Sequence, residues 1–254
     1  SEYFHTQLYT GTGSSGLEVR NNANSGDFTP DWLWVKPRSA SDNHVLFDSS
    51  RGFDKQLKSN GNDAEDTHSP AKFTRETNGF DIDSTDGNYN GNGTTYVAWQ
   101  WKCNNATTAS NSDGGITSTV QANTTAGFSI ILYTGTGSTS SVGHGLGDTP
   151  DWIIYKRRSG GTRDWMVFHQ IASAGGKGLI LNSASAGDTA SSIFGGNLPT
   201  STTIPVGFAT ETNTSGESHI AYAFAQKQGY SKFGRYKGTD NADGPFIYTG
   251  FKPA

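Results

Sequence analysis

Two segments of the chain alternate large apolar residues with small or polar ones at a period of two, which predicts β-strands. They read YVAWQWK at residues 96–102 and HIAYAFA at residues 219–225. The large side chains occupy matching positions in the two segments: Val97, Trp99 and Trp101, then Ile220, Tyr222 and Phe224. Small residues, Ala98 and Ala221, stand on the opposite face. We therefore expect the large face of each strand to line a domain core.

A second pair of matching strands has one face that recurs and one that diverges. The recurring face is apolar: Val45 and Phe47, then Met166 and Phe168. The diverging face changes in character: His44 becomes Trp165, and Asp48 becomes His169. We predict that the recurring face is buried. The diverging face is predicted to be more exposed, either open to solvent or specialised in each copy.

These matches belong to an internal repeat that covers most of the chain. YTGTG at residues 9–13 recurs at 133–137, and TPDW at residues 29–32 recurs at 149–152. Matched residues lie 120 to 124 positions apart: Tyr9 with Tyr133, Trp32 with Trp152, Asn60 with Asn182, and Asn90 with Asn213. A period of this length is typical of duplicated domains, so we expect the two halves to share one strand order.

A third repeat begins near the end of the sequence. FGRYKGT starts at Phe233, FIYTGFKPA starts at Phe246, and the sequence ends at Ala254. An interrupted third copy indicates a longer parent protein. The segment is dense in aromatic and β-branched residues, which are costly to leave in water. We therefore predict that residues 233–251 form strands that complete the sheet of the second domain.

The composition is typical of β-strands joined by tight turns. The 254 residues include 33 glycines, and only 17% of residues are charged, which leaves few helix formers. We predict an all-β fold of two tandem antiparallel β-sandwich domains, of jelly-roll or lectin-like type. The first repeat spans residues 1–104 and a low-complexity linker spans 105–125. Residues 126–254 hold the second repeat together with the third start at 233–254.

The charge balance narrows the range of partners. A net charge of −4 argues against a nucleic-acid surface, which needs clustered Lys and Arg. The one dense basic run, residues 156–158, is interpreted as a solvated strand edge. No apolar run approaches the ~18 residues of a membrane span, and no signal peptide is visible, so no membrane partner is expected. Cys103 is the single cysteine, which excludes a disulfide framework and fits assembly in a reducing cytoplasm.

Catalytic motifs are not found in the sequence. The histidines show no H-x-x-x-H spacing, and neither a G-x-S-x-G elbow nor a P-loop occurs. We predict a protein that is not an enzyme and has no cofactor. Two alternatives stay open. Asp81, Asp83 and Asp86 crowd one loop and could bind calcium instead of forming a solvated turn. Glu65, Asp66 and Asp81 could converge as the paired acids of a glycoside hydrolase.

The tryptophans suggest one ligand site. Most are expected in a core because their matched positions are apolar: Trp32, Trp34, Trp99, Trp101 and Trp152. Trp165 has no apolar counterpart. A sugar lays its C–H face on an aromatic ring while amide, carboxylate and guanidinium groups meet its hydroxyls. The candidate ligand site is therefore Trp165 with Arg163, Asp164 and His169.

Taken in order, the motifs resemble the tandem domains of marine bacteriophage tail fibres and related virion structural proteins. The resemblance rests on YTGTG, TPDW, HVLFDSSRG at residues 44–52, AEDT at 64–67, GFDI at 79–82 and NGNGTTYVAWQWK at 90–102. It implies a location in the virion, on a tail fibre or the capsid surface. It also implies other virion chains as partners and is compatible with a homotrimer of the full-length protein.

Three functions are compatible with these observations. The leading hypothesis is a non-enzymatic attachment module that binds a host-surface glycan or protein. The second is a structural spacer or capsid-decoration module, whose diverging faces contact other virion chains. The third is a carbohydrate-binding module of a carbohydrate-active enzyme.

Overall fold

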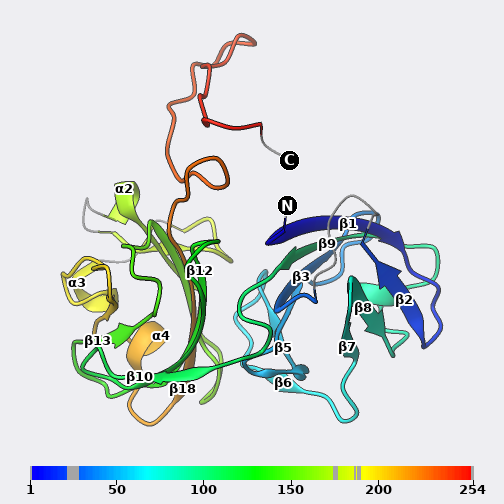
Figure 1. The fold of residues 1–254 in the computed structure, drawn as a ribbon, viewed down its shortest axis with the longest axis horizontal. Coiled ribbons are helices and arrows are strands. Elements are labelled where there is room, and N and C mark those ends of the chain that lie inside the picture. Colours follow the sequence, from blue (N-terminus) through cyan, green and yellow to red (C-terminus); the bar gives the residue numbers. More distant parts are fainter. Residues whose placement is uncertain (1, 22–28, 174–176, 186, 188–189, 253–254) are drawn as a thin grey trace.

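The computed structural model describes residues 2–21, 29–173, 177–185, 187 and 190–252. It confirms the all-β prediction: the chain forms two antiparallel β-sandwich domains that lie side by side (Figure 1). Each domain consists of one large sheet and one small sheet. No helix in the described part of the chain is long and apolar enough to cross a membrane.

The first domain packs a six-stranded sheet on a three-stranded one. The large sheet has the order β1 (Phe4–Thr10), β9 (Thr95–Trp101), β3 (Trp32–Pro37), β4 (Val45–Asp48), β5 (Gly52–Lys58) and β6 (Asp66–Thr67). The small sheet has the order β2 (Leu17–Arg20), β8 (Gly79–Ile82) and β7 (Phe73–Glu76). A single helical turn, α1 (Gly87–Asn90), precedes β9.

The second domain packs a seven-stranded sheet on a two-stranded one. The large sheet has the order β10 (Ala109–Asn111), β11 (Ser118–Asn123), β12 (Phe128–Thr134), β18 (Ser218–Phe224), β14 (Trp152–Arg157), β15 (Met166–His169) and β16 (Leu179–Ile180). The small sheet pairs β13 (Ser140–Gly143) with β17 (Thr203–Val206). The helices are α2 (Gln170–Ser173), α3 (Ala190–Ile193) and α4 (Thr210–Asn213).

The two large sheets repeat the same strand order, as the sequence predicts. The run β1-β9-β3-β4-β5 of the first domain corresponds to β12-β18-β14-β15-β16 of the second. The register agrees as well, because Trp32 pairs with Trp101 in the first sheet and Trp152 pairs with Phe224 in the second. The repeat in the sequence is therefore also a repeat in the structure.

The YTGTG motif repeats because one asparagine in each copy holds it. The Thr12 N–H donates to Asn90 Oδ1 at 2.8 Å, and the Thr136 N–H donates to Asn213 Oδ1 at 2.7 Å. Both asparagines are buried at the end of a helical turn, α1 or α4. The motif is thus a turn of the fold, and its recurrence needs no ligand to explain it.

The core of each domain lies between its large and small sheets. Val45 and Phe47 are fully buried in the first core, and Met166 and Phe168 are buried in the second, as predicted. The alanine faces of β9 and β18 also line these cores, through Ala98 and Ala221. The prediction that the large face lines the domain core is therefore wrong. The central strands of each large sheet are buried on both faces, so the alternation of large and small residues does not show which face lies against the small sheet.

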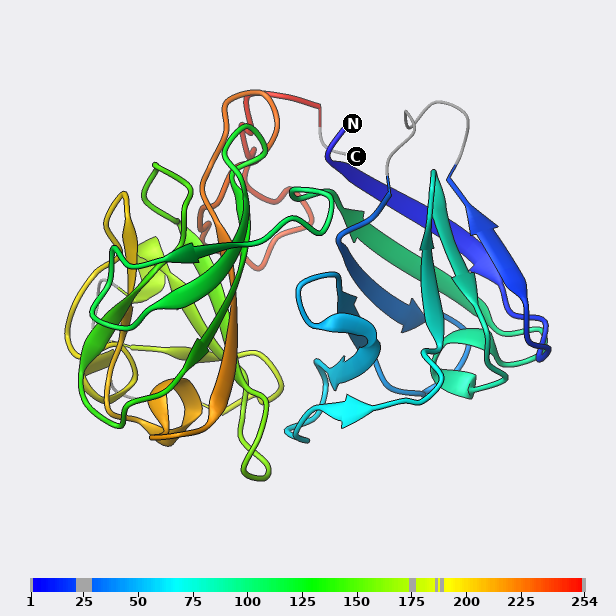
Figure 2. The same cartoon turned by 60° about the horizontal axis from the view of Figure 1, so that its bottom comes forward.

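The large faces of the two sheets meet each other and form a third core between the domains. Trp32 stacks on Tyr222 of the other domain, with ring centroids 4.4 Å apart and planes at 19°. Trp32, Leu46 and Leu57 of the first domain share one buried cluster with Phe128, Ile154, Trp165 and Tyr222 of the second. Figure 2 shows the two large sheets facing each other, with the small sheets outside.

Two further expectations about domain boundaries are corrected. The expected linker, residues 105–125, contributes β10 and β11 to the second large sheet. The C-terminal segment 233–252 forms no strand, and Phe246 is 89% exposed. Strand β18 already has a neighbour on each side, β12 and β14, so the sheet offers no free edge beside Phe224 for this segment to join.

Candidate functional site

Trp165 is not an exposed platform for a sugar. Its side chain is fully buried between the domains, and its Nε1–H donates to the carbonyl oxygen of Lys58 in the first domain at 2.8 Å. The prediction of an exposed Trp165 is therefore wrong. Its position diverges from His44 because it contacts the other domain.

The other residues of the predicted sugar site do not converge on one opening. Arg163 Nε donates to Thr210 Oγ1 at 3.0 Å, and Asp164 accepts a hydrogen bond from Asn182 Nδ2 at 2.8 Å. Both belong to the loop before β15, beside Trp165. His169 lies at the opposite end of β15, where it pairs with Trp152. The structure thus brings three of the four residues together and separates the fourth.

Lys156 of the second domain forms hydrogen bonds both to the first domain and to this loop. Its ammonium group donates to the carbonyl oxygens of Asn62 at 3.1 Å and Arg163 at 2.5 Å, and it lies 5.8 Å from the centroid of the Trp165 ring. Lys156 is fully buried, and burial lowers its pKa to about 8. The basic run 156–158 is therefore not the solvated edge that the sequence suggested.

A buried ionic network forms a second link between the domains. Asp48, predicted to be exposed, is fully buried. Its Oδ2 accepts hydrogen bonds from Arg51 Nε at 2.5 Å and from the Tyr222 hydroxyl at 2.7 Å. Burial lowers the pKa of Arg51, but Asp48, Tyr222 and Glu65 together outweigh this and hold the pKa above its ordinary value. The prediction for Asp48 fails because this face meets the other domain.

Glu65 extends this network and is not part of a catalytic acid pair. It accepts a bidentate contact from Arg158 of the second domain, at 2.7 and 2.8 Å, and a third bond from Arg51 at 3.0 Å. Burial raises the pKa of Glu65, but the two guanidinium groups outweigh it and lower the pKa overall. Asp66 is exposed and Asp81 pairs with Arg20 in the small sheet, so the three acids do not assemble.

The calcium alternative is not supported by the positions of the three aspartates. Asp81 Oδ1 contacts Arg20 at 2.5 Å, and Asp86 caps α1 by accepting from the Asn88 N–H at 2.9 Å. Asp83 is exposed. Across the described residues, no group of three or more acidic, histidine or cysteine side chains is placed to hold a metal ion.

A groove between the domains offers a different candidate site. Its volume is about 400 Å³. The wall from the first domain consists of Trp34, His44, Ser59 and Asn60. The wall from the second domain is residues 181–184, which follow β16. The groove therefore exists only where the two domains are together.

Trp34 supplies the aromatic surface of this groove. It is only partly buried, and Trp99 supports it edge-to-face with centroids 6.1 Å apart. Its Nε1–H is buried and has no hydrogen-bond partner in the described part of the chain, so the face of the ring and not this N–H is what the groove presents. His44 borders the same space, and burial, followed by the charge of Lys36, lowers its pKa. At neutral pH the groove thus presents an indole ring and a neutral imidazole.

The groove results from an unequal match between the two copies. The His44 N–H donates to Asn60 Oδ1 at 2.9 Å, and the Trp165 N–H donates to Asn182 Oδ1 at 2.9 Å. The turn of Asn60 lies against Trp165, and the turn of Asn182 lies near Trp34 and His44. Trp165 fills its side of this reciprocal contact. The smaller His44 leaves the other side open.

Sequence reasoning missed Trp34 because its match, Ile154, is apolar. That match predicts burial correctly for Ile154, which is fully buried in the interdomain core. The signal that could have found the groove is the combination of two facts: Asn60 matches Asn182, and the bulky Trp165 stands where the first copy has His44.

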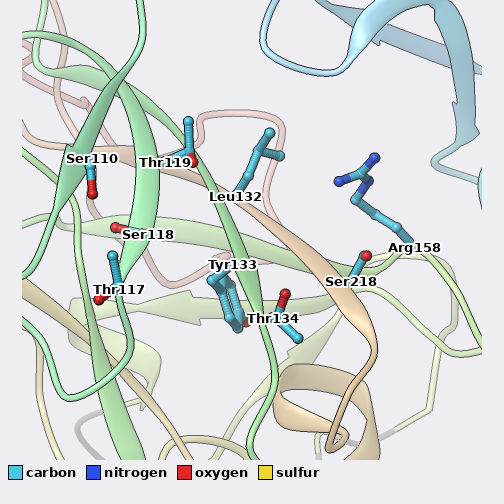
Figure 3. Close-up of a pocket in the computed structure, with 9 residues that line it drawn as sticks. All are labelled: Ser110, Thr117, Ser118, Thr119, Leu132, Tyr133, Thr134, Arg158 and Ser218. Atoms are coloured by element: carbon cyan, nitrogen blue, oxygen red, sulfur yellow. The ribbon is translucent and has the colours of Figure 1, made fainter.

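A second, smaller pocket lies on the second domain and is a weaker candidate. Figure 3 shows its hydroxyl-rich lining around β11 and β12, and its volume is about 230 Å³. Its one guanidinium group, that of Arg158, is held by Glu65. The Tyr133 hydroxyl donates to the Thr212 carbonyl oxygen at 2.6 Å. The strongest polar groups of this pocket are therefore already occupied.

Comparison with known proteins gives one match. A family model described as a domain of unknown function, DUF7483, matches residues 1–254. No curated protein and no solved structure matches the chain. Because the family model spans the whole sequence, this chain belongs to the DUF7483 family.

Proposed function

We propose that this chain is a non-catalytic attachment module of a virion and that the groove beside Trp34 binds a host-surface glycan. The observation that carries the proposal is the partly exposed indole ring of Trp34 in a groove that also holds an imidazole and hydroxyl groups. This is the chemistry that sugars use, with apolar C–H faces on the ring and hydroxyls on polar groups.

The size and rigidity of the groove support this proposal. A volume of about 400 Å³ falls in the range of about 300–1,000 Å³ that is usual for small-ligand sites. The two walls are held by the interdomain core and by the Asp48–Arg51–Glu65 network. A preformed groove avoids the ordering cost that weakens binding by flexible loops.

The resemblance to tail-fibre domains supports the virion setting. The motifs that carry it, such as YTGTG and TPDW, lie in turns and strand starts of both domains. His44, which borders the groove, belongs to another of these motifs, HVLFDSSRG at residues 44–52. The groove therefore lies beside residues that carry the resemblance.

A glycan array and a host-cell binding assay test the proposal. Trp34→Ala should lower glycan affinity by about ten-fold or more, equivalent to about 1.4 kcal/mol. Ala184→Trp should also abolish binding, because it fills the groove from an exposed position without removing a buried group. Phe208→Ala is the matched control, since Phe208 is an aromatic residue that is 60% exposed and does not line the groove.

The outcome that contradicts the proposal is specific. If Ala184→Trp and Trp34→Ala chains with native thermal midpoints bind host cells as the unmodified chain does, then the groove is not the attachment site. Glycan binding with no attachment to any host cell would instead favour a carbohydrate-binding module of an enzyme.

A structural spacer is the second candidate function, and one observation favours it. Large apolar side chains are exposed together in the C-terminal segment: Tyr236, Phe246, Ile247 and Tyr248 are 70%, 89%, 51% and 72% exposed. Clustered apolar residues of this kind commonly mark protein contacts. The two functions are compatible, because the groove and this segment are different parts of the molecule.

A further inference from the structure

Lys36 and Lys156 occupy matching positions in the two large sheets, but their ammonium groups have different surroundings. Lys156 is fully buried and donates to the carbonyl oxygens of Asn62 in the first domain and Arg163 in its own domain. Lys36 is half-buried and donates to the Pro37 carbonyl oxygen at 3.0 Å, and it has no acidic partner in the described part of the chain. An ammonium group has three N–H donors. Lys36 therefore has donors left for a further acceptor.

The strand register places Lys36 beside the groove. Val35 of β3 pairs with Val45 of β4, so one step further along this antiparallel pair Lys36 lies opposite His44. Residues opposite each other project from the same face of a sheet, with Cβ atoms about 5 Å apart. Trp34 is two residues from Lys36 on β3 and shares this face. The ammonium group thus stands next to the two rings that line the groove.

The second domain shows which way this lysine position faces. There, Lys156 stands opposite Trp165 in the same register and lies 5.8 Å from the centroid of its ring. Its ammonium group reaches the carbonyl oxygen of Asn62 in the facing turn. Asn62 stands two positions after the asparagine that holds its turn, and Ala184 stands at the same place in the matching turn and lines the groove. The groove therefore lies where the matching contact would join Lys36 to the turn of Ala184.

The charges beside the groove favour an anion. Burial and then the positive charge of Lys36 lower the pKa of His44, and no carboxylate of the described residues offsets them. Asp164, near the facing turn, accepts a hydrogen bond from Asn182 Nδ2 at 2.8 Å and acts on the buried Lys156 cation. The chain as a whole has a net charge of −4. This part of the groove is therefore a local positive site on an acidic protein.

We propose, on the basis of the proposed function, that the sugar in the groove is acidic: Lys36 and His44 bind its carboxylate while its ring lies on Trp34. The free donors of the ammonium group form charge-assisted hydrogen bonds to the carboxylate. A neutral imidazole donates one N–H and accepts a hydroxyl at its other nitrogen, and the indole packs against a C–H face. A uronic acid carries the carboxylate, the hydroxyls and the C–H face on one ring.

Paired oligosaccharides test whether the carboxylate is recognised. Oligomers of glucuronate, galacturonate and mannuronate are each compared with their carboxyl-reduced forms, which keep the stereochemistry and lose the negative charge. Isothermal titration calorimetry of the full chain should show at least one acidic oligomer binding about ten-fold more tightly than its reduced form, through one charge-assisted contact. This preference should weaken as the salt concentration rises, because Lys36 is only half-buried.

Substitutions of Lys36 test which group recognises the carboxylate. Lys36→Gln removes the charge and keeps an N–H donor, so it should lower the affinity for the acidic oligomer to that of the reduced form and leave the reduced form unaffected. Lys36→Arg keeps the charge and should retain most of the preference. Lys55→Gln is the matched control, since Lys55 is a partly exposed lysine of the same domain that does not line the groove. Thermal midpoints establish that the variants are folded.

Three results would overturn the proposal. These are reduced forms that bind as tightly as the acidic oligomers, Lys36→Gln that keeps the preference for the acidic form, and a panel in which no acidic oligomer binds. Binding of reduced forms that is lost in Trp34→Ala would leave the groove as a site for neutral sugars, so only the acidic class would fail. Failure of the groove itself is a different result, in which Trp34→Ala and Ala184→Trp change neither glycan binding nor attachment to host cells.

Discussion

The loop before β4 in the first domain and the loop before β15 in the second share a hydrogen-bond framework but carry different side chains. Asn60 and Asn182 hold the two loops with bonds of equal length, 2.9 Å. The indole of Trp165 is buried against the other domain, whereas the imidazole of His44 borders an open groove. In this pair of loops the asparagine that holds the loop recurs, and the residue that faces the other domain differs.

This difference changes how variation between repeats should be interpreted. A residue that diverges between two copies appears free of structural constraint when each domain is considered alone. Asp48 and Trp165 diverge, yet both are fully buried because they contact the partner domain. In a face-to-face pair, divergence therefore marks two kinds of position: an interface that fits only one partner, and a site such as the groove.

Asp48→Ala should produce the largest effect on this interface. It leaves Arg51 and the Tyr222 hydroxyl without their shared acceptor in a buried site, and such losses cost about 3–5 kcal/mol. Urea denaturation monitored by tryptophan fluorescence measures the change. We expect the single transition of the unmodified chain to separate into two, one for each domain.

The control for this experiment is Asp66→Ala, which removes an exposed carboxylate in the same region and should change stability by less than about 0.5 kcal/mol. Equal effects of the two substitutions would show that the buried network does not hold the domains together.

Trp165→His makes the second domain resemble the first. It should lower the free energy of unfolding by about 3 kcal/mol, since it leaves a cavity and removes the hydrogen-bond donor to the Lys58 carbonyl oxygen. The measurement is the free energy of unfolding. Phe208→Ala serves as the control, because it truncates an exposed aromatic residue. A loss below about 1 kcal/mol would mean that Trp165 is not an anchor of the interface.

Acid sensitivity should differ between the domains. His219 of the second domain accepts the Thr214 N–H at 3.1 Å, in the place where the Tyr96 hydroxyl of the first accepts the Gly91 N–H at 2.8 Å. Burial lowers the pKa of His219 to about 4. Its contribution to stability is present above pH 6.5 and is lost as pH falls toward 4, because only the unfolded chain binds the proton. We expect the free energy of unfolding to fall by about 2–3 kcal/mol between pH 6.5 and pH 4 through this group.

His219→Tyr restores the arrangement of the first domain and isolates this effect. The difference in unfolding free energy between the two chains should grow in favour of the variant from pH 6.5 to pH 4. Other acid-sensitive groups, such as Glu65, cancel in this difference. A difference that is constant with pH would assign the acid response to groups other than His219.

Local features of the fold were predictable from the sequence, and contacts between domains were not. The repeat predicted two all-β domains, and the recurring apolar face of β4 and β15 predicted the burial of Val45 and Phe47. The error at Trp99 and Trp101 has a physical cause: a sheet buried on both faces gives the same alternation whichever face meets the core. The groove escaped prediction because its walls are more than 100 residues apart in sequence.

The smallest effect on stability is expected from His44→Trp, which makes the first domain resemble the second. In the second domain, Asn182 accepts the backbone N–H of a tryptophan, Trp165, at the position that matches His44. Asn60 accepts the His44 N–H in the same way, so the loop of the first domain should also accommodate a tryptophan. The new indole would occupy part of the groove of about 400 Å³. Filling a cavity of this kind changes the free energy of unfolding by about 1 kcal/mol or less in either direction, and differential scanning calorimetry measures the change.

The same substitution should abolish glycan binding, so His44→Trp separates stability from function more cleanly than Trp34→Ala does. A loss of several kcal/mol would show that the two loops are not equivalent in shape. If neither stability nor glycan binding changed, the two loops would be equivalent in shape, and the glycan would bind somewhere other than the groove.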